Sequence, residues 1–230
     1  MDDVTRNRID AFDRCAQWFD DNAVGVDSNV KLKNLVVDFD AKLATLHTEA
    51  GEQSGAVSES EEQTGVKGDS REDCIAIATK VNKAAKAAEI EQPGIQARYP
   101  YPRNLNDEDL VNLLRSYAIG GVDDDQIIRD YGAPSDWVAQ CTALANAFEA
   151  AGQAQAAAKG DKVGKRALVL SLVDQLMQLK RTAGYIIENV FENDVAALAS
   201  WKSASHVEVP PKKAKPPTPP TPGSRSVPAN

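Results

Sequence analysis

The sequence is poor in the residues that cross-link a chain or bind metal ions. It holds three cysteines, Cys15, Cys74 and Cys141, with no CxxC spacing. An odd number of widely spaced cysteines fits neither a disulfide framework nor a zinc site, so we expect reduced, buried thiols. The two histidines, His47 and His206, belong to no ExxH pair. A carboxylate-bridged di-metal site in a helical bundle would need such pairs, and we predict no metal ligand.

Motifs for phosphate or cofactor binding are also missing. The sequence has no Walker-type loop, no GxGxxG fingerprint, no GxSxG elbow and no CxxCH haem attachment. The acidic run Asp123–Asp125 lacks the spacing of an EF-hand loop and is better explained as acids that complement a helix N-terminus. We therefore assign no catalytic residue and no cofactor.

Long apolar runs and basic clusters are absent. No stretch of about eighteen apolar residues occurs, and the acidic N-terminal segment lacks the apolar core of a secretory signal. The formal net charge is −8, with lysines and arginines spread along the chain. Nucleic acids and anionic membranes are bound mainly through basic surfaces, so neither is expected as a partner. We expect a cytoplasmic protein.

Helix-forming residues at helical spacing are abundant. Alanine, leucine, aspartate, glutamate and lysine dominate, while aromatic residues make up only 6% of the 230 residues. Apolar residues recur in steps of three and four along most of the chain, which is typical of amphipathic helices. The sequence predicts an all-α fold, an antiparallel helical bundle of about six or seven helices.

Glycine, serine and proline divide the first half of the chain. We expect a first helix over about 3–21, a second from the N-cap Ser28 to about 50, and a third that begins at Ser70 and ends before Pro93. Residues 51–69, GEQSGAVSESEEQTGVKGD, are either a frayed helix extension or the exposed turn of a hairpin.

The second half is divided in the same way. Asn106 is expected to cap a fourth helix that Gly120 and Gly121 end, and a short helix follows over about 123–131. A fifth helix over about 138–158, a turn at 159–164 and a strongly periodic sixth helix to about 190 come next. A last short helix follows Asp194.

We expect two helical hairpins. One pairs the second helix with the third, and the other pairs the fifth helix with the sixth. Each expected turn contains Lys-Gly-Asp, at 67–69 and at 159–161. The hairpins are therefore interpreted as a divergent internal repeat, although a shared tripeptide also arises by chance. A true repeat would make the core pseudo-symmetric.

The connection over 92–105, QPGIQARYPYPRNL, is the main candidate site. Its three prolines predict an extended, non-helical crossing over the bundle. The candidate residues are Arg98, Tyr99, Tyr101, Arg103 and Asn104, because tyrosine and arginine combine contact area with directional donors. In the structural alternative, the tyrosines pin the crossing to the bundle and the arginines pair with surface acids.

The candidate crossing allows two functional interpretations. An interaction surface would present the tyrosines and arginines on an exposed patch. A small-molecule or enzymatic pocket would direct Arg98 and Arg103 to an anion, with Tyr99 or Tyr101 stacking or transferring a proton. The two differ in whether the arginines converge on a cavity.

The C-terminal residues differ in composition from the rest. From Pro210 the sequence reads PPKKAKPPTPPTPGSRSVPAN, basic and proline-rich with no apolar anchor. We therefore expect a helical domain over residues 1–208 and a disordered, polyproline-type tail over residues 209–230. The tail is interpreted as a linker, with a docking motif for an aromatic-lined groove as the alternative.

Three short motifs carry a resemblance. They are RIDAFDR at Arg8–Arg14, PRN at Pro102–Asn104, and WKSASHVE at Trp201–Glu208 before the proline-rich tail. Together they resemble an uncharacterised family of all-helical bacterial hypothetical proteins, over most of residues 1–208. The resemblance implies a bacterial source but no activity, cofactor or catalytic residue.

The sequence favours a structural or protein-interaction module over an enzyme. The expected partner is another protein or a second copy of the chain, because long apolar stripes serve internal cores and dimer seams alike. The alternative is a small-molecule-binding or enzymatic bundle with an anion pocket near residues 98–104.

Overall fold

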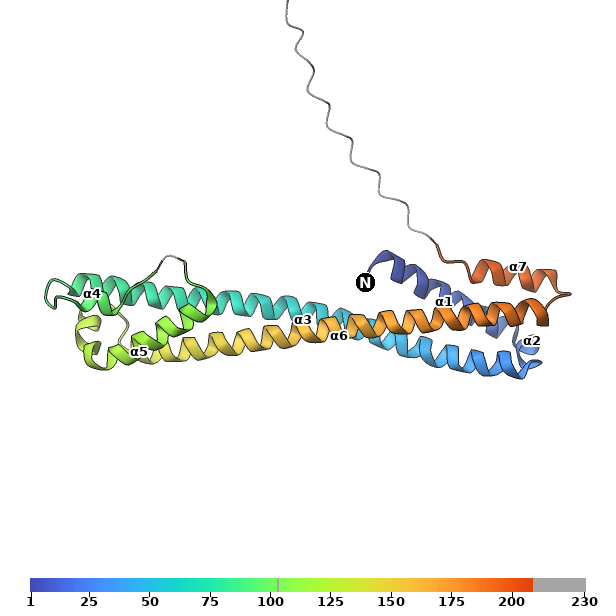
Figure 1. The fold of residues 1–230 in the computed structure, drawn as a ribbon, viewed down its shortest axis with the longest axis horizontal. Helices are drawn as coiled ribbons and strands as arrows, with labels where there is room; N and C mark the ends of the chain where they lie inside the picture. The colour runs from blue at the N-terminus through green and yellow to red at the C-terminus, as the bar shows by residue number, and fades with distance from the viewer. Residues whose placement is uncertain (103, 209–230) are drawn as a thin grey trace, which may run out of the picture. The chain divides into compact units, whose positions relative to one another are not determined.

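A computed structural model describes residues 1–102 and 104–208, and the expected tail over 209–230 lies outside them. Within the described residues the chain forms helices only, which confirms the all-α fold class (Figure 1). The helices are α1 (Asp3–Asp21), α2 (Ala23–Asp27), α3 (Val30–Ala88), α4 (Ile95–Arg98), α5 (Asp107–Asp130), α6 (Trp137–Val190) and α7 (Val195–Ala204).

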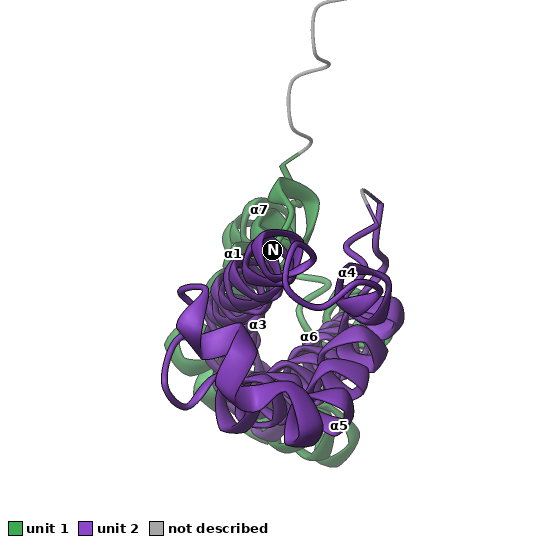
Figure 2. Cartoon of the chain, turned by 90° about the vertical axis from the view of Figure 1, so that its left-hand side faces the viewer, with its two compact units in different colours: residues 1–40, 176–230 green, residues 41–175 purple. Residues whose placement is uncertain are grey.

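The chain divides into two compact units (Figure 2). Unit 1 holds Met1–Asp40 and the chain from Leu176 onward, and unit 2 holds Ala41–Gln175. The first part of α3 and the last part of α6 therefore belong to unit 1, whereas the remainder of both helices belongs to unit 2.

Side-chain caps begin several helices where the sequence indicates. Asn106 Oδ1 accepts a hydrogen bond from the Asp109 amide at 2.8 Å, and Asp194 Oδ1 accepts one from the Ala197 amide at 2.9 Å. The expected cap at Ser28 is wrong, because Asn29 Oδ1 accepts from the Leu32 amide and α3 begins at Val30. An amide side chain one residue later therefore satisfies the free N–H groups.

Three expected breaks lie inside continuous helices. Residues 51–69 belong to α3, residues 159–164 belong to α6, and Gly120 and Gly121 lie within α5. The two expected hairpins are therefore wrong, and neither Lys-Gly-Asp tripeptide marks a turn. Glycine weakens a helix by about 1 kcal/mol relative to alanine but does not end one that a neighbouring helix supports.

Within unit 2, α3 and α6 run antiparallel. Lys165 Nζ of α6 contacts Glu49 Oε2 of α3 at 3.2 Å, as well as Glu52. Further along, Gln155 Nε2 donates to Thr64 Oγ1 at 3.2 Å. The segments that the sequence indicates as breaks thus belong to two helices that support each other.

The main core of unit 2 lies where α4 and α5 pack on this helix pair. Its largest fully buried side chains include Tyr99, Tyr117, Trp137 and Phe148. Gly121 is required there, because a Cβ atom at this position would lie 2.4 Å from the Trp137 ring. The glycine expected to end α5 instead allows α5 to approach α6.

Unit 1 has an aromatic core of its own. The Trp18 ring lies 5.1 Å from Trp201 of α7 and 5.4 Å from Phe191, and Phe19 lies 5.5 Å from Phe39. Trp18 Nε1 also donates to Ser200 Oγ at 2.8 Å, which ties α1 to α7. Edge-on aromatic pairs of this kind stabilise a small core beyond the area that they bury.

Candidate functional site

The sequence predicted a wholly extended crossing over 92–105. This prediction is wrong, because part of the crossing is helical. Gly94, with a φ of 95°, precedes the single turn of α4. Glu89 supports this turn by accepting hydrogen bonds from the Gly94 and Gln96 amides, both at 2.8 Å. These bonds lower the pKa of the Glu89 carboxyl group. One helical turn fits between Pro93 and Pro100 because neither proline lies inside it.

Asp124 of α5 fixes the crossing through two charge-assisted contacts. Its Oδ2 accepts a hydrogen bond from the Tyr99 hydroxyl at 2.8 Å and lies 2.8 Å from Arg98 Nη1. The Asp124 side chain is only 3% exposed, and Tyr99 is fully buried. Burial and the neighbouring carboxylate raise the pKa of the Tyr99 hydroxyl. Tyr99 therefore stays protonated and acts as a donor.

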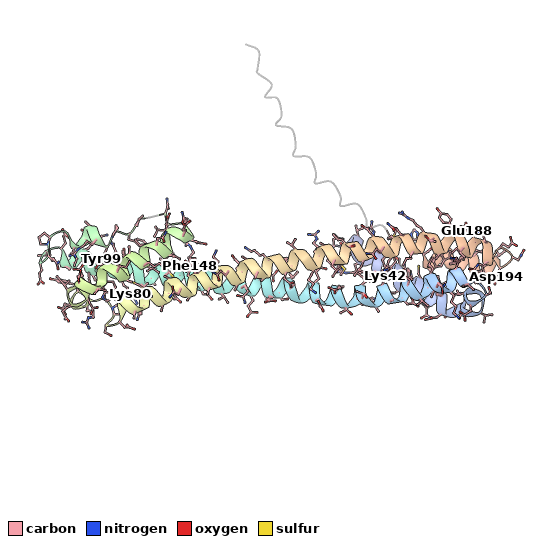
Figure 3. All side chains as sticks on the ribbon, turned by 60° about the horizontal axis from the view of Figure 1, so that its bottom comes forward. Lys42, Lys80, Tyr99, Phe148, Glu188 and Asp194 are labelled. Carbon is pink, nitrogen blue, oxygen red and sulfur yellow. The ribbon has the colours of Figure 1, made fainter. Side chains whose placement is uncertain are left out.

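Further contacts attach the backbone of the crossing to α3 and α5. Asn82 Nδ2 donates to the Tyr99 carbonyl at 2.6 Å, and the Tyr117 hydroxyl donates to the Pro100 carbonyl at 2.5 Å. The Tyr99 ring lies 5.3 Å from Tyr117 and 5.8 Å from Trp137. Figure 3 places Tyr99 in the part of unit 2 that α5 covers. The Tyr99 end of the crossing is thus part of the core.

The candidate residues fall into different environments. Tyr99 is fully buried, so its side chain lies in the core and not on an exposed patch. Arg98 is partly exposed but is paired with Asp124. Tyr101 is half-buried and Asn104 is exposed, whereas Arg103 lies outside the described residues. For Tyr101 and Asn104 the interaction role stays a prediction.

Two grooves flank Tyr101. One has a volume of about 420 Å³ and includes Asn82, Lys86 and Glu89 in its lining. The other has a volume of about 410 Å³ and is lined in part by Arg71 and Asn104. Arg98 lines neither groove. Arg71 is engaged, because it donates to Asp107 Oδ1 at 3.1 Å and to the Leu105 carbonyl at 2.8 Å.

A third groove lies where the N-terminus of α5 meets α3 and α6. Its volume is about 330 Å³. Asp107 Oδ2 lies 2.7 Å from Lys67 Nζ, and Arg115 Nη2 contacts Glu149 at 2.6 Å. Lys67, followed by Arg71, lowers the pKa of the Asp107 carboxyl group. These charges are paired across the elements, so the groove presents little net charge to a ligand.

The cysteines and histidines form no reactive or metal-binding cluster among the described residues. All three cysteines are buried and reduced, as expected. Burial raises the pKa of the thiols of Cys15 and Cys141 to about 12 and that of Cys74 to about 11. A thiol must ionise to act as a nucleophile, so these thiols are inert in the folded chain.

Sequence reasoning missed the residues that anchor the crossing. Asp124 was assigned to a helix N-terminus, but it lies inside α5 and binds two side chains. The run Asp123–Asp125 gives one weak signal: consecutive helical residues point in different directions, so a run of three acids can place one of them toward the core. Nothing in the sequence links Asn82 to Tyr99.

Comparisons with known proteins identify no relative. No family model matches the chain, and neither curated proteins nor solved structures show a match. None of the helices described in the structure is long and apolar enough to cross a membrane.

Proposed function

We propose that this chain is a structural or protein-interaction module that acts through the outer faces of its helices. The observation that supports it best is an open face on the α3 and α6 pair of unit 2. Val163 of α6 is 68% exposed there, and Leu170 is 39% exposed. Apolar side chains seven residues apart on one helix form a row that a second helix can cover.

The candidate crossing lends less support to a catalytic or ligand-binding function. An anion pocket would need an arginine directed into a cavity, but Arg98 is directed at Asp124 and lines neither groove beside Tyr101. Tyr99 is held protonated in the core, so it is a poor proton-transfer group at neutral pH. We therefore favour the interaction module over the pocket.

Site-specific photo-crosslinking in a lysate of the native cell tests this proposal. A photoreactive residue replaces Val163 on the open face in one protein and Val24, which is 90% exposed on unit 1, in a matched control. We expect a discrete protein adduct from position 163 and none from position 24. The same pair of proteins ending at Glu208 reports whether the tail contributes.

Two outcomes would contradict the proposal. No adduct from either position would indicate that the helical faces contact no protein. Equal adducts from both positions would indicate random collision. In either case the groove beside Tyr101 becomes the better candidate, to be examined by ligand screening against the wild type and Tyr101→Ala.

A further inference from the structure

In unit 2, α5 and the crossing cover one side of the α3 and α6 pair over part of its length. On α6 this side is marked by Glu149, which contacts Arg115 of α5, and by Gly152, which lines the adjoining groove. On α3 it is marked by Asn82, which binds the crossing, and by Ile75 seven residues earlier, which lines the groove beside Tyr101.

The same side continues along both helices beyond α5. Steps of three and four from Glu149 and Gly152 define an α6 row, and the same steps back from Ile75 define an α3 row. The α6 row is Ala156, Lys159, Val163, Arg166 and Leu170, and the α3 row is Gly51, Ser54, Ser58, Glu61 and Gly65. Every residue of both rows is exposed.

The two rows are complementary in shape and charge. The α6 row is bulky, apolar and basic, through Val163, Leu170 and its two cations. The α3 row is small and carries one carboxylate, Glu61. A Cβ atom added at Gly51 or Gly65 would have no neighbour within 4 Å. These glycines therefore have no packing partner in this chain, although each costs the helix about 1 kcal/mol relative to alanine.

We propose that a second copy of this chain covers the open face, with the α6 row of each copy on the α3 row of the other. This inference rests on the proposed function and names the partner. A two-fold axis makes both contacts at once, because every copy carries both halves of the interface. The small α3 row of the partner admits Val163 and Leu170, and the partner's Glu61 faces the cations.

The alternative pairing of two α6 rows is disfavoured by charge. It would bring Lys159 and Arg166 of one copy toward the same cations of the other, and like charges in contact are destabilising. Pairing of two α3 rows would leave Val163 and Leu170 uncovered. The reciprocal arrangement is the one that both covers the apolar side chains and opposes unlike charges.

The expected assembly is weak and depends on concentration. Each row spans about fifteen residues, or roughly 22 Å of helix at 1.5 Å per residue. Two such rows form a smaller interface than the roughly 800 Å² per partner of a standard stable complex. Sedimentation velocity of the full chain over a hundredfold concentration range should therefore show monomer converting to dimer as concentration rises.

Charge reversal tests the pairing. Lys159→Glu with Arg166→Glu, and separately Glu61→Lys, should each weaken the dimer at least tenfold. Mixing these two variants should pair opposite charges at both contacts, one in the native sense and one reversed, and so produce a mixed dimer. Asp161→Lys and Glu59→Lys change exposed charges on the same helices outside the rows, so they should leave the dimer unchanged. Circular dichroism confirms that each variant is folded.

Three results would overturn the inference: a monomer at every concentration, a dimer that the row variants do not weaken, or a dimer that the control variants weaken equally. These failures are distinguishable from failure of the proposed function. A monomer that still forms a discrete adduct through position 163 in the lysate keeps the interaction module and replaces the second copy with a different protein.

Discussion

At the residue scale, Asp124 should be the polar side chain on which unit 2 depends most. Replacing it with alanine leaves the buried Tyr99 hydroxyl without an acceptor and Arg98 without its partner. We expect Asp124→Ala to lower the free energy of unfolding by about 2–4 kcal/mol. Urea denaturation followed by circular dichroism measures this change. Asp123→Ala, at an exposed neighbour, should stay within about 0.5 kcal/mol of the wild type. Equal losses for both would show that Asp124 is not an anchor.

Two glycines of the helices should respond to alanine in opposite directions. A methyl group at Gly121 meets the Trp137 ring and Val138, so Gly121→Ala should destabilise the protein by about 1–3 kcal/mol. At Gly55 of α3 the added methyl group has open space, so Gly55→Ala should stabilise it by up to about 1 kcal/mol. Thermal unfolding of both variants tests the sign. A stabilising Gly121→Ala would contradict the close packing of α5 on α6.

The candidate site shows what can be predicted at the residue scale. The residue types were informative: the structural alternative, in which tyrosines pin the crossing, describes Tyr99, whereas Arg98 pairs with the buried Asp124 and not with a surface acid. Their partners could not be predicted. Asp124 lies 25 residues from Tyr99 in sequence, and only the packing of α5 brings the two together. Local spacing does not encode which residues of separate elements meet in a tertiary core.

At the element scale, the facing middle segments of α3 and α6 should be the least protected part of unit 2. Their contact line contains Gln53, Ser60 and Ala158 as buried residues, in place of large apolar side chains. Exposed glycines add to this weakness. Amides over 51–66 and 153–168 should exchange hydrogen at least tenfold faster than those over 74–88. Mass spectrometry measures the exchange of these segments. Uniform exchange along α3 would contradict this expectation.

The same segments explain why helix boundaries were predicted only in part. Helix ends with a side-chain cap, at Asn106 and Asp194, were recognised because the capping bond is local. Residues 51–69 and 159–164 carry the composition of a turn, yet each belongs to a helix that the antiparallel partner supports. Local propensity was overridden by pairing across more than ninety residues of sequence, as between Thr64 and Gln155.

The attachment of α5 to α3 should depend on pH through Asp107. Lys67 and Arg71 lower the pKa of its carboxyl group in the folded chain. The resulting stability is present above the unfolded pKa, near 4, and is lost as pH falls through the lower folded value. At pH 7, Asp107→Asn should cost about 0.2–1 kcal/mol, because the pair is partly exposed. The difference between variant and wild type should shrink as pH falls below about 4 and vanish once Asp107 is protonated in the folded chain. A constant difference over this range would contradict the ion-pair account.

At the scale of the whole molecule, the division into two units is the property that sequence reasoning did not predict. Spacing along a helix reports which face is buried, but not where one core ends and another begins. Both α3 and α6 contribute to each unit without interruption. The core of unit 1 contains the aromatic cluster around Trp18, and the core of unit 2 contains the buried cluster around Tyr99. Between Leu46 and Cys74, α3 has no large buried apolar side chain.

The two units should therefore unfold at different denaturant concentrations, and the cysteines can report this. Cys15 belongs to unit 1, whereas Cys74 and Cys141 belong to unit 2, and all three are buried with a raised thiol pKa. Native protein should resist a thiol reagent at pH 8, because both exclusion and protonation protect the sulfur.

Along a urea series, labelling resolved by peptide mass spectrometry should give one midpoint for Cys15 and another shared by Cys74 and Cys141. Each unit has its own buried core, so we expect each midpoint to follow the stability of its own unit. Trp201→Ala, which removes a large side chain from the aromatic core of unit 1, should lower the Cys15 midpoint and leave the other midpoint in place. A single midpoint for all three thiols, moved as one by Trp201→Ala, would instead show that the continuous helices make the units cooperative.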